Sequence, residues 1–259
     1  MTLGICKLCC EEKELQRSHV IGKTVFSRLL RKSVGNAAIN ICVKERKISK
    51  SNDTWDSKLL CKSCESFFNR KFEDYSIHVL RKEQRSVNAI ESDLGIFFKN
   101  VDQYRLILYL CSIYWRAAYS SHSSYDGIII EKELSQYLVN VFLDKYKLNP
   151  KIISARIRLV KDGNVGKLFN SPVSMIINPY HQLKANGYVY CMYYEGYFFE
   201  LFIRSTTFKE RLKPGFLNRL NKSFFIPVVD INELPEIAEC ISEIRSIHNE
   251  TPDEAKLRL

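Results

Sequence analysis

The sequence CKSCESFFNRKFE, residues 61–73, decides the fold of the N-terminal part of this chain. It begins with the pair Cys61-x-x-Cys64, and a similar pair, Cys6-x-x-Cys9, lies near the start. Four thiolates in two short pairs are the ligand set of a tetrahedral structural zinc site. Four unrelated core cysteines are the alternative, and spacing alone does not separate zinc from iron. We predict that these four cysteines bind structural Zn²⁺.

The nine cysteines do not suggest a disulfide framework, because their number is odd. The N-terminus lacks the apolar core of a signal peptide, and no segment has the length and apolarity of a membrane span. We therefore expect a cytosolic protein without membrane contact. The role of Cys10 stays open beside the zinc ligands. The remaining cysteines are predicted to be small buried apolar residues: Cys42, Cys111, Cys191 and Cys240.

A helix is predicted directly after the second cysteine pair. Its apolar residues recur at spacings of four, three and four and form a core-facing stripe: Phe68, Phe72, Tyr75 and Val79. On a neighbouring face, polar residues recur every four positions: Glu65, Asn69 and Glu73. The pattern predicts a row of polar groups beside the zinc site.

His19 is the candidate catalytic residue. It follows Ser18 inside the cysteine module, and no other histidine precedes His78. A lone histidine can also be structural, with its ring hydrogen-bonded at a turn. A neutral imidazole can take a proton from water at neutral pH. We therefore predict that His19 is the general base that activates a water for attack on a phosphodiester.

Oxygen ligands for a second, catalytic cation are predicted on the helix. Glu65 either stabilises the helix N-terminus or binds Mg²⁺ or a similar ion. Asn69, one turn later, either binds the same ion or orients a ligand. Asp56 is a candidate to accept the other ring N–H of His19. Two asparagines compete with Asp56 for that role: Asn40 and Asn52.

The segments CKLC, RSHVIGK and LLCKSCESFFNRKFE resemble the HNH (His-Me finger, ββα-metal) endonucleases that carry a four-cysteine zinc. The resemblance covers roughly the first third of the chain. It implies that a β-hairpin and a helix clamp one divalent ion, Mg²⁺ or Mn²⁺, and that zinc staples the hairpin to the helix. By this resemblance His19 is the base, Glu65 binds the ion, and the four cysteines bind zinc.

The chain departs from the family at two positions, and the family's loop asparagine has no clear counterpart, with Asp56 nearest in position. Many members have Asp-His where this chain has Ser18-His19, and Cys-His where it has Cys64-Glu65. Either Glu65, Asn69 and Glu73 rebuild the ion site, or hydrolysis is weak or lost. A subgroup of bacterial proteins with Ser-His and Cys-Glu at these places looks similar, and some lie in phage-defence loci. The resemblance thus implies a role in antiviral defence.

The remainder of the chain predicts an α+β fold with a mostly antiparallel sheet. We expect a zinc-stapled HNH module over residues 1–95 and an α+β domain over residues 96–259. Gly35 to Ser57 is predicted as a hairpin or a long loop. Helices are expected at 101–120, 131–146 and 234–248. Arg116, in the buried first of these, either pairs with an acidic residue or lines a pocket. Predicted strands are 152–160, 172–178, 187–195, 197–204 and 223–230, with a turn at Glu195-Gly196.

The formal net charge is +10, and the excess lies early in the chain. Residues 1–50 carry eleven Lys and Arg against four Asp and Glu. A basic surface suits a polyanion. Later in the chain, a stretch of basic residues is interleaved with Phe208 and Phe216. This stretch either contacts nucleic acid or is a solvated connection between strands. Its basic residues are Lys209, Arg211, Lys213, Arg219 and Lys222.

These observations predict a metal-dependent HNH endonuclease that hydrolyses phosphodiester bonds of nucleic acid, with DNA favoured over RNA. The C-terminal domain would serve targeting, sensing or assembly, through a protein partner or a second copy of the chain. The alternative is a catalytically silent, zinc-stapled module that binds nucleic acid or protein. A third interpretation is a structural subunit whose partner supplies the chemistry.

Overall fold

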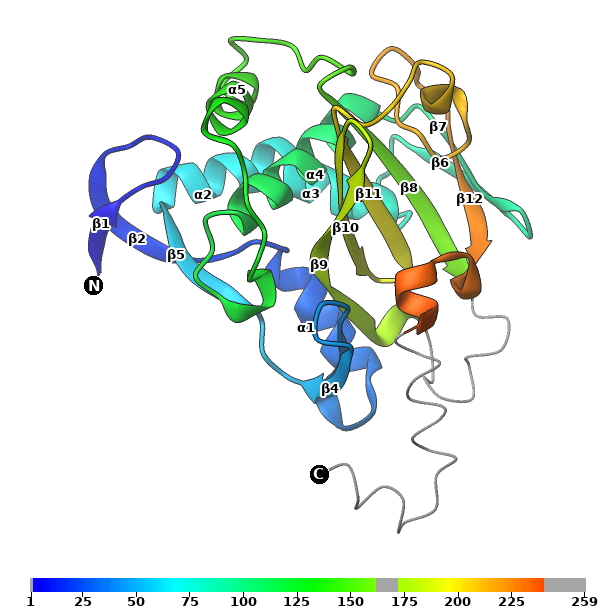
Figure 1. The fold of residues 1–259 in the computed structure, drawn as a ribbon, viewed down its shortest axis with the longest axis horizontal. Helices are drawn as coiled ribbons and strands as arrows, with labels where there is room; N and C mark the ends of the chain where they lie inside the picture. Colours follow the sequence, from blue (N-terminus) through cyan, green and yellow to red (C-terminus); the bar gives the residue numbers. More distant parts are fainter. Residues whose placement is uncertain (1, 162–171, 240–259) are drawn as a thin grey trace.

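Two β-sheets organise residues 2–161 and 172–239, which are the residues described by the computed structural model (Figure 1). The small sheet has the order β1-β2-β5, and the nine-stranded sheet has the order β4-β3-β9-β10-β11-β8-β12-β7-β6. Only the β3–β9 and β12–β8 pairs of the large sheet are parallel. The predicted α+β class with a mostly antiparallel sheet is confirmed.

The strands of the small sheet are β1 (Leu3–Ile5), β2 (Glu12–His19) and β5 (Asp56–Cys61). The large sheet consists of β3 (Ala38–Cys42), β4 (Lys47–Ser51), β6 (Asn88–Ser92), β7 (Gly95–Lys99), β8 (Ile153–Lys161), β9 (Met175–Lys184), β10 (Gly187–Tyr194), β11 (Tyr197–Ile203) and β12 (Phe224–Asp230). The labelled α-helices are α1 (Lys23–Lys32), α2 (Lys62–Phe68), α3 (Asp74–Leu80), α4 (Gln103–Ala117) and α5 (Lys132–Phe142).

The centre of the large sheet is the β9-β10-β11 meander. Glu195 and Gly196 form the two-residue turn between β10 and β11, and both have positive φ, 50° and 85°. Positive φ at both central residues is the type I′ turn that matches strand twist, so the predicted hairpin is confirmed. β9 runs to Lys184, beyond the predicted end at residue 178, because it stays paired with β10 up to the Gly187–Lys184 pair.

Helix α4 packs on the large sheet and is buried nearly all round, as its apolar sequence predicts. Its Trp115 joins an aromatic cluster with Phe68 and Phe72 from the cysteine-led helix and Phe142 of α5. The predicted apolar stripe is confirmed, since Phe68 and Phe72 are buried here. Through this cluster the segment after the cysteines shares one core with the large sheet.

The large sheet draws strands from both sides of residue 95. β3, β4 and β6 come from the first 95 residues, and β3 pairs with β9. The β3–β4 hairpin confirms the hairpin interpretation of residues 35–57. The predicted boundary between residues 95 and 96 coincides with the start of β7.

Three further predictions concern the last helix, the remaining cysteines and membrane spans. Residues 235–239 are helical, and the rest of the helix predicted to residue 248, with Cys240, lies outside the described residues. Cys111 and Cys191 are buried, whereas Cys42 is only half-buried. Among the described residues, no helix has both the length and the apolarity needed to cross a bilayer.

Candidate metal centre and active-site cleft

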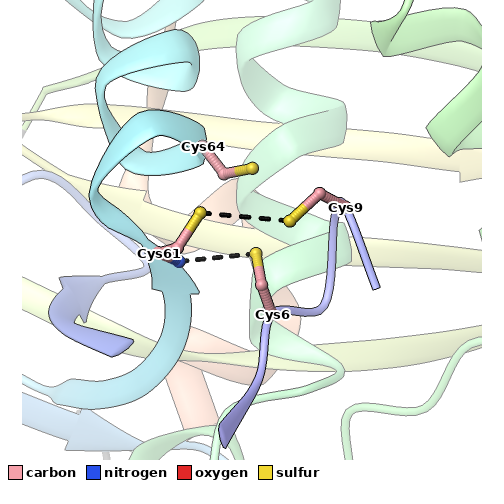
Figure 2. A group of neighbouring side chains, drawn as sticks. All are labelled: Cys6, Cys9, Cys61 and Cys64. Carbon is pink, nitrogen blue, oxygen red and sulfur yellow. Dashed lines mark hydrogen bonds between the residues drawn. The ribbon is translucent and has the colours of Figure 1, made fainter. Parts of the chain in front are cut away.

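The two cysteine pairs meet where the loop between β1 and β2 contacts the start of α2 (Figure 2). The four Sγ atoms all lie within 4.8 Å of one another, and Cys9 Sγ is 4.0 Å from Cys61 Sγ. Tetrahedral zinc with Zn–S bonds of about 2.3 Å requires sulfurs about 3.8 Å apart. The structure therefore confirms that these four cysteines form one cluster that could bind a metal such as zinc.

Local backbone geometry shapes the cluster. The N–H of Cys6 donates to Glu11 O at 3.0 Å and that of Cys10 to Cys6 O at 2.9 Å, which closes the first loop. The N–H of Cys61 donates to Cys6 Sγ at 3.4 Å and ties the two pairs together. Cys10 itself is exposed and lies outside the cluster. Cys10 is therefore not a ligand of this site.

The thiols of the cluster respond differently to their surroundings. Burial raises the pKa of the Cys61 thiol, but hydrogen bonds from Ser63 and from the Cys64 N–H outweigh burial and lower it to about 6. Burial and the neighbouring thiols raise the pKa of Cys64 well above its usual range. Four adjacent thiolates repel one another, and a bound dication removes that repulsion.

Substitution Cys61→Ser should remove one of the four sulfur ligands of the cluster. We expect the purified variant to hold less than one zinc per chain and to unfold or aggregate, measured by elemental analysis and thermal unfolding. The matched control is Cys10→Ser, which should keep full zinc content and the melting temperature of the parent. Normal folding of Cys61→Ser without metal would contradict a structural metal site.

A cleft of about 500 Å³ lies beside the cysteine cluster. β2, the start of α1 and the helix after the second cysteine pair form its walls. It brings together four residues that the sequence singled out: His19, Glu65, Asn69 and Glu73. The predicted row of polar groups therefore faces one cavity.

His19 ends β2 and is half-buried. Its Nε2 lies 3.2 Å from Thr54 Oγ1. Burial lowers the pKa of its imidazole, although the nearby carboxylates of Asp56 and Glu65 act in the opposite direction. The ring is therefore largely neutral at pH 7, which is the state that can accept a proton.

Glu65 projects into the cleft from the first turn of α2. Ser18 Oγ donates a 2.8 Å hydrogen bond to Glu65 Oε2, so the residue before His19 orients this carboxylate. A π-helical turn, Asn69–Glu73, follows α2, and the N–H of Asp74 bonds to Asn69 O. Such turns are rare and occur frequently at functional sites, where they alter which side chains face a cavity.

Glu73 closes the inner end of the cleft. Arg116 of α4 is fully buried, and its Nη2 donates to Glu73 Oε2 at 3.1 Å. Its Nη1 donates to the carbonyl oxygen of His19 at 2.8 Å. Burial raises the pKa of Glu73, while Arg116 counteracts that effect. The prediction that Arg116 has an acidic partner is confirmed, and the same side chain holds the backbone of the candidate base.

Gly22 fits tightly against this pair. A Cβ at Gly22 would lie 2.1 Å from Glu73 Oε1, so no larger residue can stand there while the carboxylate keeps its place. Gly22 precedes α1, whose first residues Lys23 and Thr24 also line the cleft. The absence of a side chain at Gly22 thus lets the start of α1 lie against the Glu73 carboxylate of the π turn.

Asp56 makes a different hydrogen bond from the one predicted. It stands opposite His19 in the β2–β5 pair, but its carboxylate accepts two hydrogen bonds from Arg17, at 2.8 and 2.6 Å. Arg17 lowers the pKa of Asp56 and keeps it ionised. The hydrogen-bond partner of the His19 ring is Thr54 rather than Asp56, Asn40 or Asn52.

Three basic residues of the cleft were not singled out from the sequence: Arg17, Lys23 and Lys62. Nothing in the pattern distinguishes them from other surface lysines and arginines, because their convergence depends on the pairing of β2 with β5. The basic residues between 209 and 222 do not line this cleft, since they belong to the connection between β11 and β12. The two predicted regions are therefore separate.

No family model, curated protein or solved structure matches this chain.

Removing Arg116 should leave the Glu73 carboxylate buried without its cation. We expect Arg116→Met to lower the free energy of unfolding by about 3–5 kcal/mol in chemical denaturation. The double variant Arg116→Met with Glu73→Gln should recover part of that loss, because no unpaired charge remains. An exposed arginine, Arg85, provides the control, and Arg85→Met should change stability by no more than about 0.5 kcal/mol. An equal loss in the single and double variants would contradict the pairing.

Proposed function

We propose that this protein is a metal-dependent endonuclease of the HNH type, acting on the phosphodiester bonds of nucleic acid. The observation that carries the proposal is the cleft itself. It sets a half-buried, largely neutral His19 beside the carboxylate of Glu65 and among the basic side chains of Arg17, Lys23 and Lys62. A base, an oxygen ligand and cationic groups in one cavity are the parts that phosphodiester hydrolysis needs.

The order of elements supports this proposal. β2 pairs with β5 in antiparallel fashion, α2 follows β5, and the cysteine cluster joins the loop before β2 to the start of α2. The sequence resemblance to zinc-bearing HNH endonucleases implies this order of hairpin, helix and staple. The preference for DNA over RNA and a role in antiviral defence rest on that resemblance alone.

The donor atoms of the cleft fit a hard divalent cation. Carboxylate and amide oxygens are the protein ligands that Mg²⁺ and Mn²⁺ accept, and Glu65 and Asn69 present such oxygens one turn apart. When bound there, the ion would supply Lewis-acid stabilisation of the negative charge on the phosphate.

The chain's own residues would divide the other tasks. His19 accepts the proton of the attacking water at its ring nitrogen. Ser18 holds Glu65 in place, and Arg116 fixes the backbone of His19. Lys23 and Lys62 line the cleft and would neutralise phosphates beside the scissile bond, whereas Arg17 is already paired with Asp56.

A catalytically silent binding module is the second candidate. It is favoured by the small number of carboxylates available to a cation. Of the cleft's two glutamates, Glu65 already accepts from Ser18 and Glu73 is paired with Arg116. Such a module would still bind a polyanion through the basic cleft residues, and substitution of His19 would leave it unaffected.

The base is tested by the pH dependence of supercoiled plasmid cleavage in Mg²⁺ or Mn²⁺. The rate should rise as His19 loses its proton and level off above its pKa, which burial holds below 6.5. His19→Ala should lose cleavage by roughly 10²–10⁴-fold while it retains fold and zinc. The control is His78→Ala, on the exposed side of α3, which should cleave like the parent. Equal activity in His19→Ala and the parent would show that His19 is not the general base.

The ion ligand is tested by metal titration of the same cleavage reaction. Glu65→Gln keeps the size of the side chain but removes its charge, so a higher Mg²⁺ or Mn²⁺ concentration should be needed for half-maximal rate. Glu133→Gln, at an exposed position of α5, should leave the titration unchanged. A titration curve for Glu65→Gln that overlays the parent curve would exclude Glu65 as a ligand.

A further inference from the structure

A second cavity, of about 210 Å³, lies under the connection between β11 and β12. Figure 1 shows this connection, in yellow to orange, on the opposite side of the molecule from the small sheet. None of the residues that line the catalytic cleft lines it. Its walls are mainly apolar, and they include Tyr104, Ile107, Leu148, Phe208, Leu212 and Leu217.

Two arginines also line this cavity. Arg211 donates from Nη1 to Thr206 O at 3.0 Å, and Arg219 donates from Nη1 to Leu148 O at 3.1 Å. Within residues 2–161 and 172–239, neither guanidinium has a carboxylate partner, and no acidic residue lines the cavity. The nearest acid along the chain, Glu210, is engaged by Thr207. The cavity is therefore apolar inside and positively charged at its edge.

Apolar side chains of this connection are exposed beside the cavity. Phe208 is 68% exposed, Leu212 67% and Leu220 81%. Phe216, which the sequence paired with Phe208, is buried instead against Phe202, with the guanidinium of Arg156 over both rings. Phe208 is thus the aromatic ring of this stretch that a ligand can reach.

The connection is anchored rather than loosely attached. Gly215 N–H donates to Phe225 O, and its carbonyl accepts from the N–H of Ile157. A Cβ at Gly215 would lie 2.6 Å from Ile157 O, and its φ is +85°, so glycine allows this close approach to β8. The cavity is therefore largely preformed, which lowers the entropic cost of binding.

We propose that this cavity binds an unpaired nucleobase of the nucleic acid that the cleft cleaves, with Phe208 stacking on the base and Arg211 and Arg219 contacting the adjoining phosphates. This inference rests on the proposed function. The cavity is smaller than the roughly 300–1,000 Å³ of sites for whole drug-sized ligands, which suits a single planar ring system. Aromatic stacking with flanking cationic groups is the usual means of holding single strands.

The substrate class follows from this geometry. A base inside a duplex is stacked on both faces and cannot enter a cavity. The second site therefore selects a strand that is single or locally opened, and Lys209, Lys213 and Lys222 add positive charge along the same connection. A substrate engaged at both sites would have to reach from the connection to the catalytic cleft.

The test is fluorescence anisotropy with a labelled oligothymidine of about a dozen nucleotides, a site-size typical of such strands. The full chain carries His19→Ala, and no divalent ion is added, so that cleavage does not interfere. Phe208→Ala should weaken binding about 5- to 150-fold, which corresponds to the loss of one stacked base. The apolar control Leu183→Ala, 87% exposed on β9, should bind like the parent.

Two further probes identify the occupant. An abasic strand with the same number of phosphates should bind the parent weakly and should be insensitive to Phe208→Ala. Arg219→Gln should weaken binding of both strands, while the exposed control Arg85→Gln should not. Equal affinity for the abasic and base-bearing strands, or tighter binding of a duplex that Phe208→Ala leaves unchanged, would overturn the proposal.

The outcomes separate this inference from the proposed nuclease. Metal-dependent plasmid cleavage, with no effect of Phe208→Ala on strand binding, would support the proposed nuclease and contradict base binding in this cavity. Strand binding that depends on Phe208, in a protein that never cleaves, would support the cavity and favour the silent binding module.

Discussion

The cysteine cluster is the constraint on which the candidate site depends. It joins the loop before β2 to the junction of β5 and α2, segments far apart in the sequence. Because His19 lies at the end of β2 and Glu65 in the first turn of α2, the same junction brings His19 and the Glu65 carboxylate to one cleft. A closed four-cysteine site contributes folding energy and leaves the chemistry to neighbouring groups.

A buried cation extends this constraint into the rest of the molecule. Arg116 comes from α4, the helix that packs on the large sheet, and it binds both Glu73 and the carbonyl of His19. The cleft is therefore held from two sides, by the cysteine cluster and by the helix that packs on the large sheet. A change in how α4 sits on the sheet would reach His19 directly, which offers a route by which the large sheet could influence the cleft.

Local patterns in the sequence predicted much of this arrangement. The CxxC spacing identified the cluster, the apolar stripe from Phe68 to Val79 identified the helix, and Glu195-Gly196 identified the central hairpin. These features depend on residues close together in the chain. The parallel pairing of β3 with β9 depends on contacts between distant segments, so no periodicity could show it.

The detailed geometry of the cleft could not be predicted from the sequence either. The π turn after α2 leaves no clear mark in composition, and the bond from Ser18 to Glu65 requires β2 and α2 to be in place first. The partner of Asp56 could not be predicted either. The sequence suggested a bond to the His19 ring, but the Asp56 carboxylate accepts from Arg17. The resemblance of the first third of the chain to HNH endonucleases remains a prediction.

Anomalous diffraction from crystals soaked in Mn²⁺, recorded at the zinc and manganese edges, would locate both metals. We expect a zinc peak among the four cysteines and a separate manganese peak in the cleft, next to Glu65 and Asn69. A zinc peak alone, with no manganese in the cleft at concentrations that saturate known Mn²⁺ enzymes, would contradict a metal-dependent nuclease and leave a zinc-stapled binding protein.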